Sequence, residues 1–146
     1  MLKSKSFIIF LGLAILLVAG YVLAATQLYL NSVYAHNPGN QTVGVPFDVS
    51  AATVWQIYGS QRHRVWVNVK HEVGGSSEWC NKQEIVDLPT PPALSRNITT
   101  TTWATFNISS AGTYTHTATS YLDDMDSFAS AGPKSNTSSS FQVSDP

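Results

Sequence analysis

Hydrophobic and polar residues alternate along short stretches of the chain after residue 25, and turn-forming clusters separate these stretches. Neighbouring side chains on a β-strand point to opposite faces, so every second residue lies on the same face. Within one strand, residues with odd numbers therefore share one face and residues with even numbers share the other, and we call this property the parity of a residue. The sets that share a parity are Phe47, Val49, Ala51, Trp55 and Ile57; Val65, Val67 and Val69; Ile98, Ala104, Phe106 and Ile108; Tyr114, His116 and Ala118; Phe141 and Val143. This pattern predicts an antiparallel all-β domain.

Two further runs complete the predicted set of strands. Leu28 and Leu30 begin the first strand, and Ile85 or Val86 belongs to a short middle strand. Clusters of glycine, proline, serine and asparagine are expected to break the strands at residues 36–40, 58–61, 73–77, 88–92, 109–112 and 130–136. About seven strands in roughly 120 residues is the size of a β-sandwich, and a small jelly roll is the alternative architecture.

Three stretches carry a resemblance to a known family. The sequence AGTYTHTATSYLDD, residues 111–124, opens an alternating run with Gly-Thr-Tyr. It resembles the penultimate strand of the immunoglobulin-like modules of microbial surface proteins, including the PKD-like and CARDB-like groups. GVPFDVSA (residues 44–51) resembles their second strand, and NTSSSFQVS (residues 136–144) resembles the last. The resemblance implies an immunoglobulin-like sandwich in which the Tyr114 hydroxyl bonds to backbone near the preceding turn.

The chain departs from antibody domains at two places. Cys80 is the single cysteine, so the paired cysteines are absent, and His116 stands where the second would fall. We expect His116 to be neutral, buried and hydrogen-bonded, because an unpaired buried imidazole is costly. Trp66 has the opposite parity to Val65 and Val67, so either Trp66 faces outward or the register is shifted by one.

The N-terminal segment indicates export. Lys3 and Lys5 precede an uncharged apolar run of residues 7–25, which ends in Ala24 and Ala25. Residues 1–25 therefore form a cleaved signal peptide or an uncleaved transmembrane anchor. A pilin-like start, cut near Ser6 with the apolar helix kept, is a third alternative. Each alternative places the domain of residues 26–146 outside the cytoplasm, secreted or held at the outer face of the cytoplasmic membrane.

Four Asn-x-Ser/Thr sequons are candidate glycosylation sites, at Asn40, Asn97, Asn107 and Asn136. Asn97 and Asn107 have the opposite parity to Ile98, Phe106 and Ile108, which predicts that both asparagines face solvent. The remaining two sequons lie in predicted turns.

Other residues are candidates for binding. Trp103 takes the outward parity among threonines, as an exposed binding residue does, and the alternative is a bulge that turns Trp103 inward. Arg62 and Arg64 flank His63 and are candidates for contact with an anionic glycan or polymer. His63 and His71 are expected to be exposed, and they lie too far apart on one strand to share a metal.

Metal and catalytic signals are weak. Asp123, Asp124 and Asp126 are a candidate calcium cluster, without the glycine and distal glutamate of an EF-hand loop. The spacing argues against a blue-copper site, because no histidine follows Cys80 before His116. The sequence holds no Gly-x-Ser-x-Gly elbow and no His-Glu-x-x-His motif. We expect no cofactor and no enzymatic activity.

These observations predict a non-enzymatic, extracellular adhesion or structural domain that works by surface contact. Its expected partners are envelope proteins, a glycan or copies of itself. Only 12% of the residues are charged and the net charge is -1, which argues against nucleic acid. The alternatives are a filament subunit, in which residues 26–35 add a strand to a neighbour, and an exported metal-binding domain.

Overall fold

The computed structural model describes residues 25–89 and 94–146, and these residues form an all-β protein without helix. The sequence led us to expect about seven strands, whereas the described residues form ten. The strands are β1 (Gln27–Ala35), β2 (Gln41–Thr42), β3 (Phe47–Gly59), β4 (Gln61–Val73), β5 (Ser76–Leu88), β6 (Leu94–Phe106), β7 (Gly112–Tyr114), β8 (His116–Asp124), β9 (Ser130–Thr137) and β10 (Phe141–Ser144). The signal or anchor expected at residues 1–25 lies almost wholly outside the described residues. Within the described part of the chain, we find no helix with the length and hydrophobicity to cross a bilayer.

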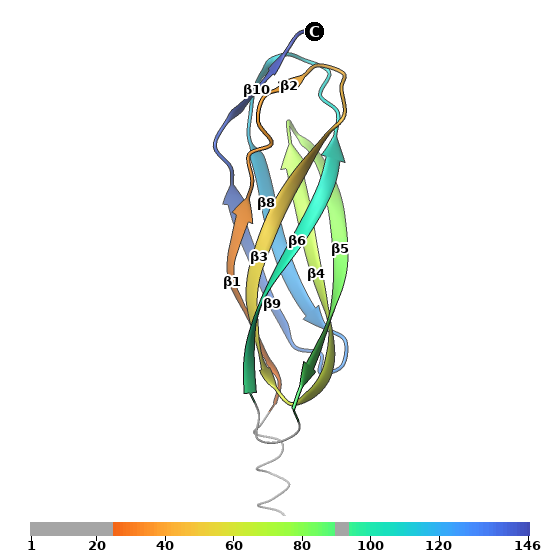
Figure 1. The fold of residues 1–146 in the computed structure, drawn as a ribbon, viewed down its shortest axis with the longest axis vertical. Helices are drawn as coiled ribbons and strands as arrows, with labels where there is room; N and C mark the ends of the chain where they lie inside the picture. The colour runs from red at the N-terminus through yellow and green to blue at the C-terminus, as the bar shows by residue number, and fades with distance from the viewer. Residues whose placement is uncertain (1–24, 90–93) are drawn as a thin grey trace, which may run out of the picture.

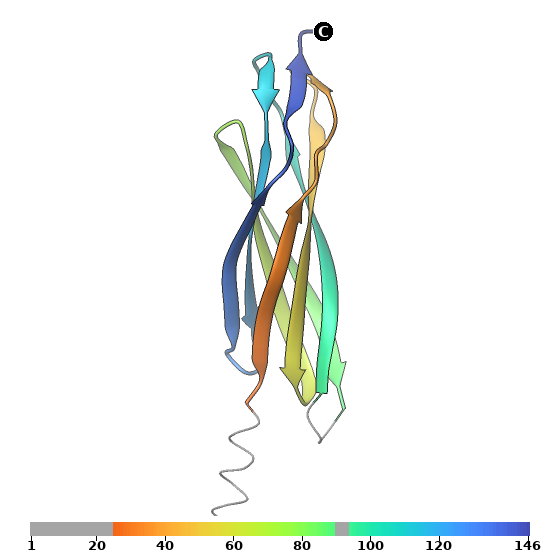
Figure 2. The ribbon, with the colours of Figure 1, turned by 90° about the vertical axis from the view of Figure 1, so that its left-hand side faces the viewer.

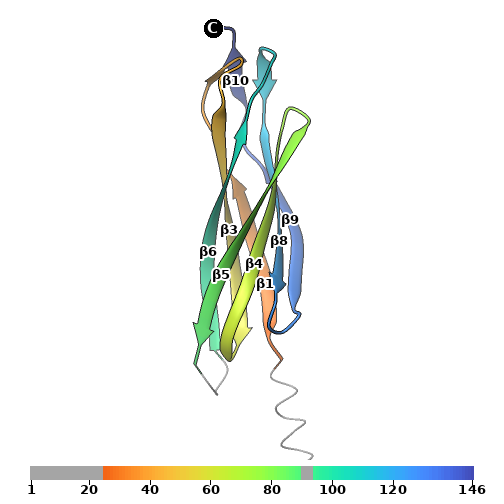
Figure 3. The same cartoon turned by 90° about the vertical axis from the view of Figure 1, so that its right-hand side faces the viewer.

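The strands form three sheets, and the two larger ones face each other. One has the order β1-β3-β6, and the other has the order β5-β4-β8-β9. Their edges meet where β1 lies beside β9 (Figure 2) and where β5 lies beside β6 (Figure 3). The small sheet β2-β10-β7 closes the end of the molecule where β10 ends, opposite the end where β1 begins (Figure 1).

The parity of the sequence identifies the buried face correctly. The predicted inward residues of β3 and β4 are buried, among them Trp55 and Val67, which are fully inaccessible. Val86 is the inward residue of the middle strand, since Ile85 is 51% exposed. Trp66 alternates with buried neighbours on β4 and faces outward, so the register of that strand is as predicted.

Two segments differ from the prediction. Residues 130–136, expected to be a break, form most of the edge strand β9. Pro133 is tolerated there because an edge strand has one side on which no ladder bond is needed. The expected strand of residues 111–124 is divided at Thr115 into β7 and β8. The last segment of the chain is divided similarly, at residues 138–140, into β9 and β10. The backbones of His116 and Ser138 bond at this point, where each chain segment passes from the large sheet to the small one.

A bulge on β9 shapes the outer face of the four-stranded sheet. Gly132 and Pro133 together oppose Tyr121, because the pairing passes from Ser120 with Lys134 to Leu122 with Ala131. Gly132 has a φ of 104°, and a Cβ built there would lie 2.8 Å from the Ser120 carbonyl oxygen. Glycine therefore lets β9 approach β8 closely beside Tyr121.

Replacement of Gly132 by alanine should destabilise the fold more than the same change at Gly75. Both glycines have positive φ, but a Cβ on Gly75 meets nothing within 4 Å. We expect a loss of about 1 kcal/mol for Gly75→Ala and at least about 2 kcal/mol for Gly132→Ala, since the latter adds a clash with backbone. Urea denaturation measures both. Equal losses would show that the close approach of β9 is not required.

Candidate functional site

A polar layer divides the core into two apolar clusters. On β4, His71 lies between Val69 of the larger cluster and Val73 of the smaller one. On β8, His116 precedes Ala118 of the larger cluster. Thr102 of β6 completes the layer, and all three polar side chains are at most 1% exposed. The expectation that His116 is buried is confirmed, whereas the expectation that His71 is exposed is wrong.

The hydrogen bonds of this layer form one directed chain. His116 Nδ1 lies 3.0 Å from the carbonyl oxygen of His36, which can only accept, so Nδ1 carries the proton. The Nε2 atom of neutral His116 then accepts from His71 Nδ1 at 3.0 Å, and His71 Nε2 accepts from the Thr102 hydroxyl at 3.0 Å. The two rings stack with centroids 5.2 Å apart. Every ring nitrogen is therefore satisfied while both imidazoles are neutral.

Burial keeps both histidines neutral. Desolvation, with a smaller contribution from His116, lowers the pKa of His71 from 6.5 to about 4. Desolvation also lowers the pKa of His116, although its bond to the His36 carbonyl acts in the opposite direction. A proton on His116 Nε2 would also meet the N–H of His71. His71 and His116 are inaccessible to solvent and have a structural role.

A third buried histidine, His63, is anchored at the other end of β4. Its Nδ1 lies 2.7 Å from Asp124 Oδ2, and its Nε2 lies 2.8 Å from the Ser60 carbonyl oxygen. The Ser60 carbonyl can only accept, so Nε2 carries a proton, and Nδ1 shares a hydrogen bond with the buried Asp124 carboxyl group. Asp124 also accepts from the Ser127 hydroxyl and the Asp126 amide, so the pair fixes the loop between β8 and β9. The predicted exposure of His63 is wrong.

The structure does not bring the candidate calcium ligands together. Asp123 points outward and accepts from the Asn68 amide at 3.0 Å, while Asp124 points inward to His63. Asp126 pairs with Arg64 at 2.8 Å, and this guanidinium lowers the pKa of the Asp126 carboxyl. Among the described residues, no three His, Cys, Asp or Glu side chains are placed to hold a metal ion.

The other candidate binding residues lie on opposite faces. Trp103 is 61% exposed on the outer side of the three-stranded sheet, as its parity predicted. Arg62 and Arg64 lie on the four-stranded sheet, where Arg62 is 3.7 Å from Asp87. The arginines and Trp103 therefore do not form one site.

All four sequon asparagines are exposed. The side-chain oxygens of Asn40 and Asn136 accept backbone N–H bonds, from Gln142 and Ala35 respectively. Asn97 lies on the outer face of β6, and Asn107 follows that strand, as their parity predicted. The Tyr114 hydroxyl donates to the Ser110 carbonyl at 2.9 Å, which confirms its predicted bond to the preceding turn.

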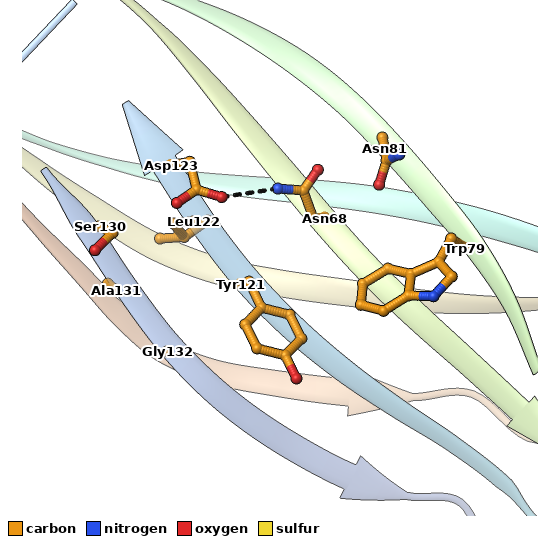
Figure 4. A pocket seen from close by; sticks show the side chains of 9 residues that line it. All are labelled: Asn68, Trp79, Asn81, Tyr121, Leu122, Asp123, Ser130, Ala131 and Gly132. Atoms are coloured by element: carbon orange, nitrogen blue, oxygen red, sulfur yellow. Dashed lines mark hydrogen bonds between the residues drawn. The ribbon is translucent and has the colours of Figure 1, made fainter. Parts of the chain in front are cut away.

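The best candidate for a binding site is a groove on the outer face of the four-stranded sheet. It consists of two hollows that share Asn68 and Asp123. The first has a volume of about 470 Å³ and is lined by Asn68, Trp79, Asn81, Tyr121, Leu122, Asp123, Ser130, Ala131 and Gly132 (Figure 4). The second has a volume of about 420 Å³ and is lined by Trp66, Asn68, Asp123, Asp124, Met125, Phe128 and Ala129. We call the two hollows together the sheet groove.

Aromatic rings border both hollows of the sheet groove. Trp79 of β5 and Tyr121 of β8 lean toward each other across β4, with ring centroids 5.9 Å apart (Figure 4). At the other hollow, Trp66 lies on β4 and Phe128 on the loop that Asp124 fixes. Trp79 is 54% exposed and Phe128 is 90% exposed, so both rings are open to a partner.

Parity alone could have predicted that two aromatic residues of the sheet groove face outward. Tyr121 has the opposite parity to His116 and Ala118, and Trp79 has the opposite parity to Val86. What the sequence did not contain is their meeting across β4, because this depends on the pairing of Asn68 with both Asn81 and Tyr121. Comparisons with protein families, curated proteins and solved structures find no match for this chain.

The histidine pair predicts a loss of stability in acid. The unfolded chain takes up a proton on His71 near pH 6.5, whereas the folded protein resists until about pH 4. The contribution of His71 is therefore complete above pH 6.5 and is lost as the pH falls toward 4. It amounts to about 3 kcal/mol at a conversion of about 1.36 kcal/mol per pKa unit.

Urea denaturation from pH 4 to 7 measures this dependence. His71→Gln should show a flatter rise of unfolding free energy with pH than the wild type, because glutamine does not titrate. His36→Gln is the control, since it alters an exposed side chain and keeps the backbone carbonyl that His116 bonds. A wild-type slope that persists in His71→Gln would contradict the assignment.

The buried hydrogen bond between His63 and Asp124 predicts that replacing Asp124 destabilises the fold much more than replacing the adjacent Asp123. Asp124→Ala leaves the buried Nδ1 atom of His63 and the Ser127 hydroxyl without their partner, which costs about 1–3 kcal/mol. Asp123→Ala removes an exposed carboxylate and should change the unfolding free energy by no more than about 0.5 kcal/mol. Thermal or urea unfolding at pH 7 distinguishes the two. Similar effects for both variants would contradict the structural role of the pair.

Proposed function

We propose that this chain is an exported, non-enzymatic binding module with an immunoglobulin-like fold, and that it acts by surface contact through the sheet groove. The fold is supported by the two strand orders, β1-β3-β6 and β5-β4-β8-β9, since immunoglobulin-like sandwiches place these sequential strands in the same way. The bond from Tyr114 to the Ser110 carbonyl supports it further. A jelly roll, built from two Greek keys of eight strands, fits these orders less well.

Export is supported by the sequence of the first 25 residues. Two lysines, an uncharged apolar run and a pair of small residues at its end are typical of a signal peptide or an anchor. The domain then lies outside the cytoplasm, secreted or tethered to the membrane. Exposed Asn97 and Asn107 are the best placed sites for glycan attachment, because neither side chain is engaged in the hydrogen bonds of the described residues.

The observation that carries the proposal is the exposure of aromatic side chains around the sheet groove. Large exposed aromatics on a hollowed surface are typical of binding sites, where tryptophan and tyrosine supply most of the energy. The contact partner is an envelope protein, a glycan or another copy of the chain, and the role is adhesive or structural. Three of the histidines support a non-enzymatic role, because they are buried in structural hydrogen bonds.

The filament alternative receives less support. It requires residues 26–35 to add a strand to another subunit. Instead β1 pairs with β3 of its own chain from Gln27 to Ala35. This pairing favours a module that supplies its own first strand.

The proposal predicts that binding to the cell envelope depends on Trp79 and not on Trp103. The full chain, kept in detergent micelles, is sedimented with detergent-washed envelopes of the source organism. Trp79→Ala should weaken binding by about tenfold or more, because a central aromatic anchor is lost. Trp103→Ala removes a tryptophan that is 61% exposed on the opposite face and should leave binding unchanged. Binding that depends on Trp103 alone would place the contact surface on the other sheet.

A further inference from the structure

The chemistry of the sheet groove identifies its ligand class. We infer that the groove binds a linear, uncharged glycan, with one sugar-stacking position on each side of the bonded pair Asn68–Asp123. This inference rests on the proposed contact surface and adds the nature of the partner. It follows from the aromatic rings, the amides, the charge balance and the shape of the groove.

The aromatic rings suit the flat faces of sugar rings. The C–H groups of a pyranose face carry small positive partial charges, and the face of an aromatic ring is negative. Trp79 offers such a face at the first hollow, and Trp66 with Phe128 does so at the second. Stacking of this kind also buries the apolar part of a sugar without burying its hydroxyls.

The polar residues between the rings suit sugar hydroxyls. A side-chain amide both donates and accepts, as a hydroxyl does, so Asn68 and Asn81 can pair with sugar hydroxyls in either direction. Asn68 already donates to Asp123, which fixes the orientation of its amide and leaves its oxygen as an acceptor. A few oriented polar groups among apolar walls are typical of small-molecule and oligosaccharide sites.

The charges on this face disfavour an anionic ligand. Its charged side chains pair with one another: Lys70 with Glu72 at 2.8 Å, Arg64 with Asp126 at 2.8 Å and Arg62 with Asp87 at 3.7 Å. Asp123 has no ion-pair partner in the part of the chain that the structure describes. The groove therefore presents a carboxylate without a free cation beside it, and this repels acidic polymers. The same carboxylate and the amides make the groove too polar for the interior of a lipid layer.

The length and walls of the groove suit an extended chain. Trp79 on β5 lies opposite Lys70 on β4, and Lys70 is four positions after Trp66. The two stacking positions are therefore about 13 Å apart along the strand direction. Along β9 the wall is low, because Ser130, Ala131 and Gly132 carry small side chains or none. A linear glycan can therefore lie along the strand direction and leave the groove at both ends.

Isothermal titration of the full chain in detergent micelles tests the ligand class. The probes are hexasaccharides of β-linked glucose and of β-linked N-acetylglucosamine, with a hexamer of galacturonic acid as the anionic comparison. We expect at least one neutral hexasaccharide to bind, and to bind about tenfold more tightly than its disaccharide and than the acidic hexamer. Trp79→Ala and Trp66→Ala should each weaken binding by about tenfold, and Trp103→Ala should not change it.

The inference is overturned if neither neutral hexasaccharide binds, if the acidic hexamer binds as tightly, or if both groove variants bind like the wild type. Failure of the ligand class is distinguishable from failure of the contact surface. If envelope binding still requires Trp79 while no neutral hexasaccharide binds, the contact surface stands and the inferred ligand class is wrong. If envelope binding is independent of Trp79, the proposed function fails as well.

Discussion

The hydrogen-bond chain from Thr102 through His71 and His116 to the His36 carbonyl is the interaction on which the fold depends. It starts on the three-stranded sheet, crosses to the four-stranded sheet and returns to the end of β1. Apolar packing alone does not fix how two sheets slide over each other, whereas a buried imidazole left without a partner costs about 1–3 kcal/mol. This chain of hydrogen bonds lies between the two apolar clusters, and it therefore favours one alignment of the two sheets.

The groove on the outer face depends on this interior. β4 and β8 carry buried anchors, His63, His71, His116 and Asp124, on one face and the groove residues on the other. Because their inner faces are fixed, Asn68 and Tyr121 are held in one register on the outer face. The bulge at Gly132 and the bonds of Asp124 to the β8–β9 loop then set the side walls of the groove. Rigid strands support such a surface better than loops do.

Much of the fold followed from parity, because the period of two decides which side chains are buried before any strand pairs with another. That is why Trp55, Val67 and Val143 were assigned correctly to the core. Parity also favoured outward positions for Trp66 and Trp103, but only the structure excluded a shifted register at Trp66 and a bulge at Trp103. The edge strand β9 was missed because its proline and glycine are ordinary turn residues, tolerated at the edge only. The exposure of His63 and His71 was predicted wrongly because their burial depends on partners 61 and 45 residues away.

The sequence by itself determined the class of fold, the two faces of most strands, the bond of Tyr114 and the burial of His116. These features are local, or follow from alternation along one strand. Tertiary structure decided which buried polar groups meet, and that Trp79, Tyr121 and Asn68 border one hollow. The physical reason is that strand pairing is a long-range choice. Alternation states that a residue faces outward, but only the register between strands determines its neighbours there.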